Sequence, residues 1–359
     1  MVFKKYRIEQ GDTLEAISKK QNIDVKELVD FHNSHNTITQ SIIGDYLPIH
    51  LEYIYLPLES PIKEENKYAE DPKEFGRKVR YRCEQVNTSK INGNLAHFLQ
   101  QNFQYVVKNN GKKNEFFVGL EDHHFDFNPT YLNPSFSFIS KTEFIKNQVY
   151  FQISEENGKL SEVNNKKEIS ENWEEFKKNE FYNDDFIIQL RKTNEHAVRE
   201  LLNMGDRQFS VDYELTEEEY RRNLFYFILF DKLLVDNIEN VENQQFDFMS
   251  TLVPPIIIPI EFRYDKISEE NNVLKFRKVG KAILNDKLIS EIKQKYDEIH
   301  KPSIKYNFTE YKLEFRVRGE FDLQTKIMEN ADLFIIEQIA DNIENNCEFH
   351  LKKLQNHTS

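Results

Sequence analysis

The chain has 359 residues, a formal net charge of −13 and an aromatic content of 13%. This length corresponds to two or three domains of about 150 residues each, and the aromatic content excludes a disordered polymer. Because the acidic charge has no compensating basic block, we expect neither a nucleic-acid-binding surface nor a polybasic membrane-binding surface.

The two cysteines, Cys83 and Cys347, lie far apart in sequence and are too few for a disulfide framework. The chain starts without the apolar run and cleavage site of a signal peptide. Its most apolar stretch, residues 252–260, is too short to span a bilayer and contains three prolines. We therefore expect a protein that is cytoplasmic as synthesised, with no membrane insertion, unless a signal-independent machine exports it.

The first 57 residues contain regular secondary-structure signals. Residues 6–8 alternate like a short strand. Asp12 and Glu15 have the spacing of a capping box and predict a helix with Asp12 as its N-cap, and Asp24 begins a second helix in the same way. Residues 53–57 form a second strand that ends in proline. The predicted order is strand, helix, helix, strand.

Residues 4–57 resemble a LysM domain. The resemblance depends on the run from Tyr6 to Ser18 with its Gly-Asp-Thr-Leu segment, on Val25 to Leu28, on Asn33, and on residues 54–57. The remaining 300 or so residues resemble no family that we recognise.

The resemblance implies recognition of N-acetylglucosamine-containing glycans such as peptidoglycan or chitin, in a groove between the first strand–helix turn and the loop after the second helix. By position, the glycan-binding residues are Gly11, Asp12, Thr13 and Leu14 on one side and Asn33, Ile42, Ile43 and Gly44 on the other. Backbone groups at helix ends suit an N-acetyl group, because they have no partner inside the helix. A single module of this size binds weakly.

The loop from Ser34 to Glu52 supports a different partner. It is longer than the short connection of a typical module, and residues 42–51 add an apolar patch. The alternative is therefore that this unit binds a protein through the Ser34–Glu52 loop.

The rest of the chain predicts an α+β fold with antiparallel sheets and central helices. We expect a linker over 58–78, an α+β lobe over 79–205, and a helix plus antiparallel-sheet lobe over 206–355, as two domains or as one. The predicted strands are 79–84, 103–107, 115–120, 148–153, 160–163, 258–264, 273–277 and 311–318; the predicted helices are 169–181, 185–202, 216–235 and 289–299. Asn157 and Gly158 form the turn of a hairpin, and Thr216 and Glu219 have capping-box spacing.

Few residues in this region point to chemistry. His123 and His124 form the most compact set of potential metal ligands. Because neighbours on a strand face opposite ways, at most one of them can join Asp122 or Asp126 in a metal site, and we expect a solvated loop instead. Cys83 and Trp173 are interpreted as core residues. We predict no catalytic residue, no metal site and no cofactor.

The sequence therefore favours a bacterial, non-enzymatic LysM-bearing binding or adaptor protein, with a component or cargo adaptor of a phage-tail-like contractile secretion system as one setting. The alternative is a peptidoglycan hydrolase or exported toxin that its LysM module targets to the cell wall.

Overall fold

The computed structural model describes residues 3–8, 12–21, 23–34, 42, 47–48, 51–57, 76–110, 114–129, 132–235 and 244–354. The chain divides into two compact units, Met1–Glu64 and Glu65–Ser359. The predicted linker over 58–78 lies outside the described residues up to position 75. Each unit is described separately below.

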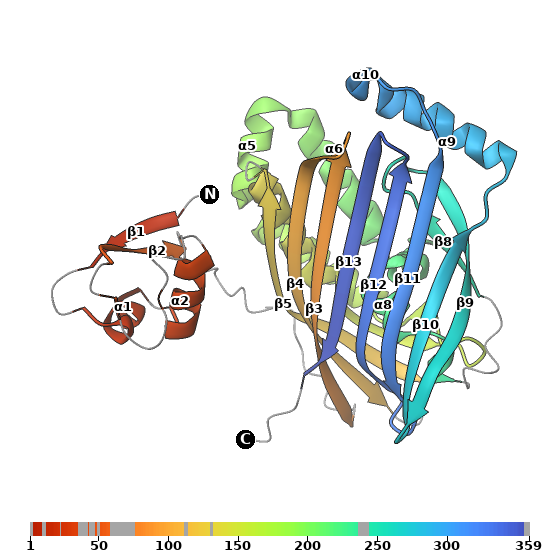
Figure 1. The fold of residues 1–359 in the computed structure, drawn as a ribbon, viewed down its shortest axis with the longest axis horizontal. Helices are drawn as coiled ribbons and strands as arrows, with labels where there is room; N and C mark the ends of the chain where they lie inside the picture. Colours follow the sequence, from red (N-terminus) through yellow and green to blue (C-terminus); the bar gives the residue numbers. More distant parts are fainter. Residues whose placement is uncertain are drawn as a thin grey trace. The chain divides into compact units, whose positions relative to one another are not determined.

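The N-terminal unit has the predicted strand–helix–helix–strand order (Figure 1). Its elements are β1 (Phe3–Arg7), α1 (Leu14–Gln21), α2 (Val25–Ser34) and β2 (Tyr53–Pro57). β1 and β2 pair antiparallel. The Oδ1 atom of Asp24 accepts a hydrogen bond from the backbone N–H of Lys26 at 2.9 Å, which confirms Asp24 as a helix cap.

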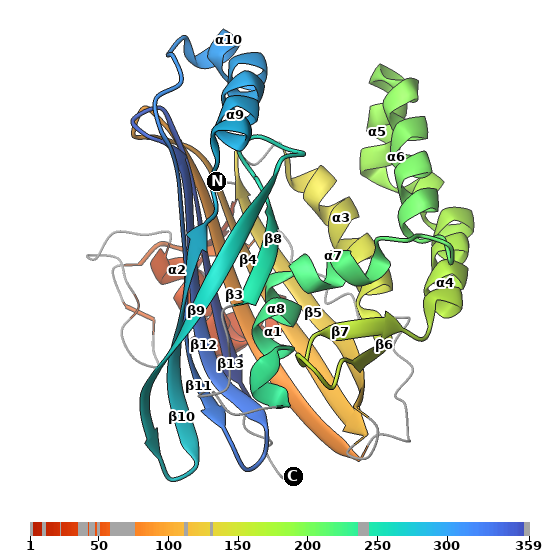
Figure 2. The same ribbon diagram turned by 90° about the vertical axis from the view of Figure 1, so that its right-hand side faces the viewer.

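The second unit contains a strongly curved antiparallel sheet (Figures 1 and 2). Within the described residues, its strand order is β7-β6-β5-β4-β3-β13-β12-β11-β10-β9-β8. The strands are β3 (Arg77–Ile91), β4 (Asn94–Asn110), β5 (Glu115–Asn128), β6 (Gln148–Ile153), β7 (Leu160–Val163), β8 (Gln244–Met249), β9 (Ile257–Glu270), β10 (Val273–Ala282), β11 (Tyr311–Asp322), β12 (Ile327–Ile339) and β13 (Ile343–Lys353).

Most helices of this unit lie on one side of the sheet, as Figure 2 shows. They are α3 (Asn133–Lys146), α4 (Lys166–Asn179), α5 (Asp185–Thr193), α6 (Glu195–Gln208), α7 (Thr216–Arg222) and α8 (Leu224–Leu229), with 3-10 turns η3 (Phe181–Asn183) and η4 (Lys232–Leu234). The helices α9 (Asp286–Ile299) and α10 (Lys301–Ile304) lie at one end of the strands (Figure 1). The α+β class with antiparallel sheets and central helices is confirmed.

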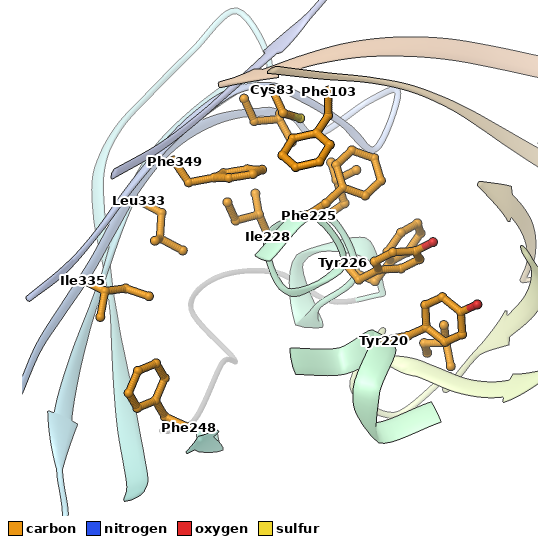
Figure 3. Packing of buried hydrophobic residues seen from close by; sticks show 14 of the residues in the cluster. Cys83, Phe103, Tyr220, Phe225, Tyr226, Ile228, Phe248, Leu333, Ile335 and Phe349 are labelled. Atoms are coloured by element: carbon orange, nitrogen blue, oxygen red, sulfur yellow. The ribbon is translucent and has the colours of Figure 1, made fainter. Parts of the chain in front are cut away.

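The core lies between the covered face of the sheet and helix α8. Phe225 and Ile228 of α8 point toward Cys83 and Phe349 of the sheet (Figure 3). The rings of Phe225 and Tyr105 stack with their centroids 3.9 Å apart. The opposite face carries charged pairs such as Arg277–Asp265 at 2.7 Å. Alternating apolar and charged residues along the strands produce this division, because successive side chains face opposite sides.

Two predicted helices are each broken by an asparagine. The segment 185–202 forms α5 and α6 because Asn194 has non-helical backbone angles and its side chain caps α6 through the N–H of Ala197 at 3.1 Å. The segment 216–235 is interrupted at Asn223, which caps α8 in the same way. The single-helix predictions are wrong because asparagine bonds more favourably to the backbone outside a helix.

The predicted capping box at Thr216 is also wrong. The N-cap of α7 is Leu215, which makes no side-chain cap. The carboxylate of Glu219 instead accepts hydrogen bonds from the Tyr213 hydroxyl at 2.7 Å and from the Lys146 ammonium at 3.0 Å. Tertiary contacts therefore replace the local cap.

The two predicted lobes, 79–205 and 206–355, both contribute strands to one sheet. They meet where β3 pairs with β13. The hairpin of β6 and β7 is confirmed, and the helix over 289–299 corresponds to α9. Strands β8, β12 and β13 and helices α3 and α10 were not predicted. In the described part of the chain, no helix has the length and apolar character required to cross a membrane.

Candidate functional site

The N-terminal end of α1 is capped by Thr13. Its Oγ1 atom accepts a hydrogen bond from the backbone N–H of Ala16 at 3.1 Å. The carboxylate of Asp12 accepts a hydrogen bond from the Tyr6 hydroxyl at 2.9 Å. The predicted N-cap at Asp12 is wrong because the helix begins one residue later, at Leu14.

The other predicted side of the groove is organised by Asn33. Its Nδ2 atom donates to the carbonyl oxygen of Ile42 at 2.9 Å, and its Oδ1 atom accepts from the N–H of Ile42 at 2.8 Å. The side chains of Ile42 and Leu51 are 2% and 7% exposed and belong to the core of the unit. Their interpretation as a docking patch is wrong, because so small a unit needs them in its own core.

These contacts limit how the predicted residues can bind a glycan. The side chain of Leu14 is fully buried, and the side-chain amide of Asn33 is hydrogen-bonded to the backbone of Ile42. Gly11, Ile43 and Gly44 lie outside the described residues. For Leu14 and Ile42, the glycan-binding assignment therefore concerns backbone groups, and it stays a prediction for all eight residues.

His32 is a buried residue of this unit that our sequence prediction missed. Its Nδ1 atom accepts a hydrogen bond from the backbone N–H of Tyr55 in β2 at 3.1 Å, and the two rings stack with centroids 5.6 Å apart. The available signal was helical spacing, since His32 lies four residues after the buried Leu28.

Replacing Asn33 by alanine is expected to destabilise the N-terminal unit by about 1–3 kcal/mol, because it leaves the N–H and C=O of Ile42 without their partners. Amide hydrogen exchange at Ile42 should accelerate, whereas the exposed Lys26→Ala control should leave it unchanged. Unchanged exchange in the Asn33→Ala variant contradicts a structural role for this side chain.

The second unit contains a buried ion pair between Lys278 of β10 and Asp231, whose side chains are 1% and 5% exposed. The hydroxyl of Tyr264 lies 3.2 Å from the Asp231 Oδ2 atom and donates to it, and burial raises the pKa of Tyr264 well above its usual value. The Lys278 Nζ atom also lies 5.1 Å from the ring centroid of Phe227.

Gly158, in the turn between β6 and β7, packs directly on the backbone of Asp231. We call Gly158, Asp231, Tyr264 and Lys278 the Asp231 junction. It joins the β6–β7 end of the sheet to the β9–β10 end. Our sequence prediction missed it, although Lys278 lies two residues after the buried Phe276 and therefore on the same face of β10.

His123 and His124 lie in strand β5, so the loop interpretation is wrong. The ring of His123 stacks on that of Phe103 with centroids 4.4 Å apart. Its Nδ1 atom is 2.8 Å from the Ser140 hydroxyl, and its Nε2 atom is 3.2 Å from Gln101 Oε1. Burial, with a contribution from His124, lowers the pKa of His123 from 6.5 to about 4.

Acid should therefore destabilise the second unit through His123. Between pH 6.5 and about 4 the unfolded chain binds a proton that the folded chain does not. The contribution of His123 is fully present above pH 6.5 and is lost as the pH falls, up to about 3 kcal/mol. In urea unfolding at a series of pH values, the His123→Gln variant should show a weaker loss of stability over this range; an unaltered pH dependence contradicts the assignment.

Cys83 and Trp173 are confirmed as core residues. Burial raises the pKa of the Cys83 thiol well above its usual value, and the indole N–H of Trp173 donates to Asp206 at 2.9 Å. Among the residues that the structure describes, no three His, Cys, Asp or Glu side chains are grouped to hold a metal ion.

Comparison with curated proteins gives no match to the chain. The family model of the LysM domain matches residues 6–31, which cover the last two residues of β1, all of helix α1 and most of helix α2. A LysM domain suggests binding to peptidoglycan or chitin-like glycans. The N-terminal unit therefore contains a LysM domain match at residues 6–31, within a strand–helix–helix–strand order that fits this domain.

Proposed function

We propose that the chain is a non-enzymatic binding or adaptor protein whose LysM domain docks to an N-acetylglucosamine glycan of the peptidoglycan type. The observation that carries the proposal is the family match over residues 6–31. The proposal is also supported by two assigned residues with a definite position, because Thr13 caps helix α1 and Asn33 holds the backbone of Ile42.

The docking role requires a second binding surface, which the unit Glu65–Ser359 supplies in this proposal. The finer form is a component or cargo adaptor of a phage-tail-like contractile secretion system, in which LysM-like modules also occur. The burial of Ile42 and Leu51 favours the glycan over a protein partner on the Ser34–Glu52 loop.

Co-sedimentation of the full-length chain with purified peptidoglycan sacculi tests the proposal. We expect the wild type to pellet and a Gly11→Trp variant, which obstructs the assigned groove, to stay in the supernatant. The matched control Lys26→Trp places the same side chain at an exposed position of α2 and should pellet like the wild type. If the wild type stays soluble, glycan binding is contradicted; if soluble muropeptides are released, the protein is a hydrolase.

A further inference from the structure

The edge strand β8 borders two cavities that share residues. One cavity, of about 360 Å³, lies beside the Asp231 junction, and the other, of about 450 Å³, lies over the covered face of the sheet. Arg222 of α7 and Phe246 of β8 line both. The two cavities therefore follow β8 on the side of α7 and α8.

In the part of the chain that the structure describes, no strand pairs with β8 along this side. Within the described residues, β8 is the last strand of the sheet and pairs with β9 alone. The N–H of Ser250 bonds toward β9, to Ile256 at 2.9 Å. Since successive residues of a strand point their backbone groups to opposite sides, Gln245, Asp247 and Met249 face the open edge. All three are exposed, Met249 to 43%.

One contact already uses this edge. The Lys159 ammonium donates to the carbonyl oxygen of Gln245 at 3.3 Å. This hydrogen bond lies at the beginning of β8. Lys159 and Arg221 both line the cavity there. Arg221 is exposed, and the described residues offer it no carboxylate at ion-pair distance. Glu218 and Asp231 also line this cavity, but each pairs with a cation of the lining, Arg222 and Lys278. Lys159 and Arg221 therefore present two cations at this end of the edge, beside the one carboxylate of Asp247.

The other end is apolar. The second cavity is lined by Leu99, Phe127, Leu224, Phe248 and Ile335, among others. An occupant of the whole edge needs unpaired backbone donors and acceptors, an apolar side chain at one end and a negative charge at the other.

We propose that β8 binds an extended peptide segment of a partner protein by strand addition, with an apolar side chain in the Phe248 cavity and a carboxylate between Lys159 and Arg221. Strand addition of this kind obtains affinity from main-chain hydrogen bonds and specificity from pockets for alternate side chains. The peptide runs antiparallel to β8, as the neighbouring strands do, so its carboxylate is C-terminal. This inference defines the second surface of the proposed adaptor but does not depend on glycan binding.

The test is fluorescence polarisation of the full chain with a labelled peptide of about six residues, alternating in apolar side chains and ending in glutamate with a free carboxylate. We expect this peptide to bind, and both its reversed sequence and a version with alternate amides N-methylated to bind at least about tenfold more weakly. No glycan is present, so the result is independent of sacculus binding. Equal binding of all three peptides, or binding of none, overturns the proposal.

Two variants locate the site. Asp247→Pro removes an N–H that faces the open edge, where proline is tolerated, and should weaken binding at least about tenfold. Asp247→Ala keeps that N–H and should bind at least as tightly as the wild type, because it removes a carboxylate from the cavity that receives the carboxylate of the peptide. Arg221→Gln leaves the backbone edge intact. It should weaken peptide binding and reduce the salt dependence of the affinity. This variant keeps the test valid if the proline variant does not fold. Wild-type affinity in a folded Asp247→Pro variant, or in Arg221→Gln, overturns the proposal.

Discussion

Replacement of Gly158 by alanine is expected to destabilise the second unit by about 3 kcal/mol or more. Gly158 has a φ of +69°, and a Cβ atom there would lie 1.9 Å from the carbonyl oxygen of Asp231. The backbone must therefore shift at a junction where Asp231 is held by Lys278. The measurement is the free energy of unfolding in urea, followed by the fluorescence of the single tryptophan, Trp173.

Gly93 provides a matched control. It has a similar φ of +75°, but among the described residues beyond its two chain neighbours, no atom lies within 4 Å of the position that a Cβ atom would occupy there. Gly93→Ala therefore carries only the backbone cost of about 1–2 kcal/mol. Equal losses at the two positions contradict a steric role for the contact between Gly158 and Asp231.

The second large effect is expected at the ion pair of the same junction. Lys278→Met leaves the buried carboxylate of Asp231 without its cation, and Asp231→Asn leaves the ammonium without its anion. Each change should cost about 3–5 kcal/mol in urea unfolding, because an uncompensated buried charge remains. The double variant should cost less than the sum of the two, by about 0.5–3 kcal/mol, because neither charge is then left alone.

Lys275 is the control for this prediction. It lies on the same strand but is exposed, and it pairs with Glu320 at 2.9 Å across the solvated face. Lys275→Met should have a much smaller effect, since water screens an exposed pair. A similar loss for Lys275→Met and Lys278→Met contradicts the importance of the buried pair.

Local sequence signals were sufficient for much of the fold. Alternation located the cores of β3, β9, β10 and β11, and Asn157-Gly158 located the hairpin of β6 and β7. Local signals failed where contacts between residues distant in sequence determine the secondary structure. Asn194 divides a continuous apolar pattern into two helices, and polar residues in β12 and β13 obscure strands that neighbouring strands stabilise on both sides.

The candidate site was predictable in its position but not in the roles of its side chains. The Gly-Asp-Thr-Leu segment identified the LysM domain, whereas the capping role of Thr13 and the hydrogen bonds of Asn33 to Ile42 became visible only in the structure. The ion pair of Lys278 joins residues 47 positions apart in sequence. No local period can reveal such a partner, although a lysine among buried neighbours indicates that one is needed.

The pairing of β3 with β13 has a consequence for how the protein is made. Lys90 and Glu344, which bond across this pair at 3.0 Å, are separated by 254 positions in the chain. Contacts of such high sequence separation form slowly, because a long loop must close before they contribute stability. On the ribosome, β3 is synthesised long before β13, so the middle of the sheet is completed last. Until then β3 and β12 both present open edges, and this is the stage at which the nascent chain is most prone to aggregation.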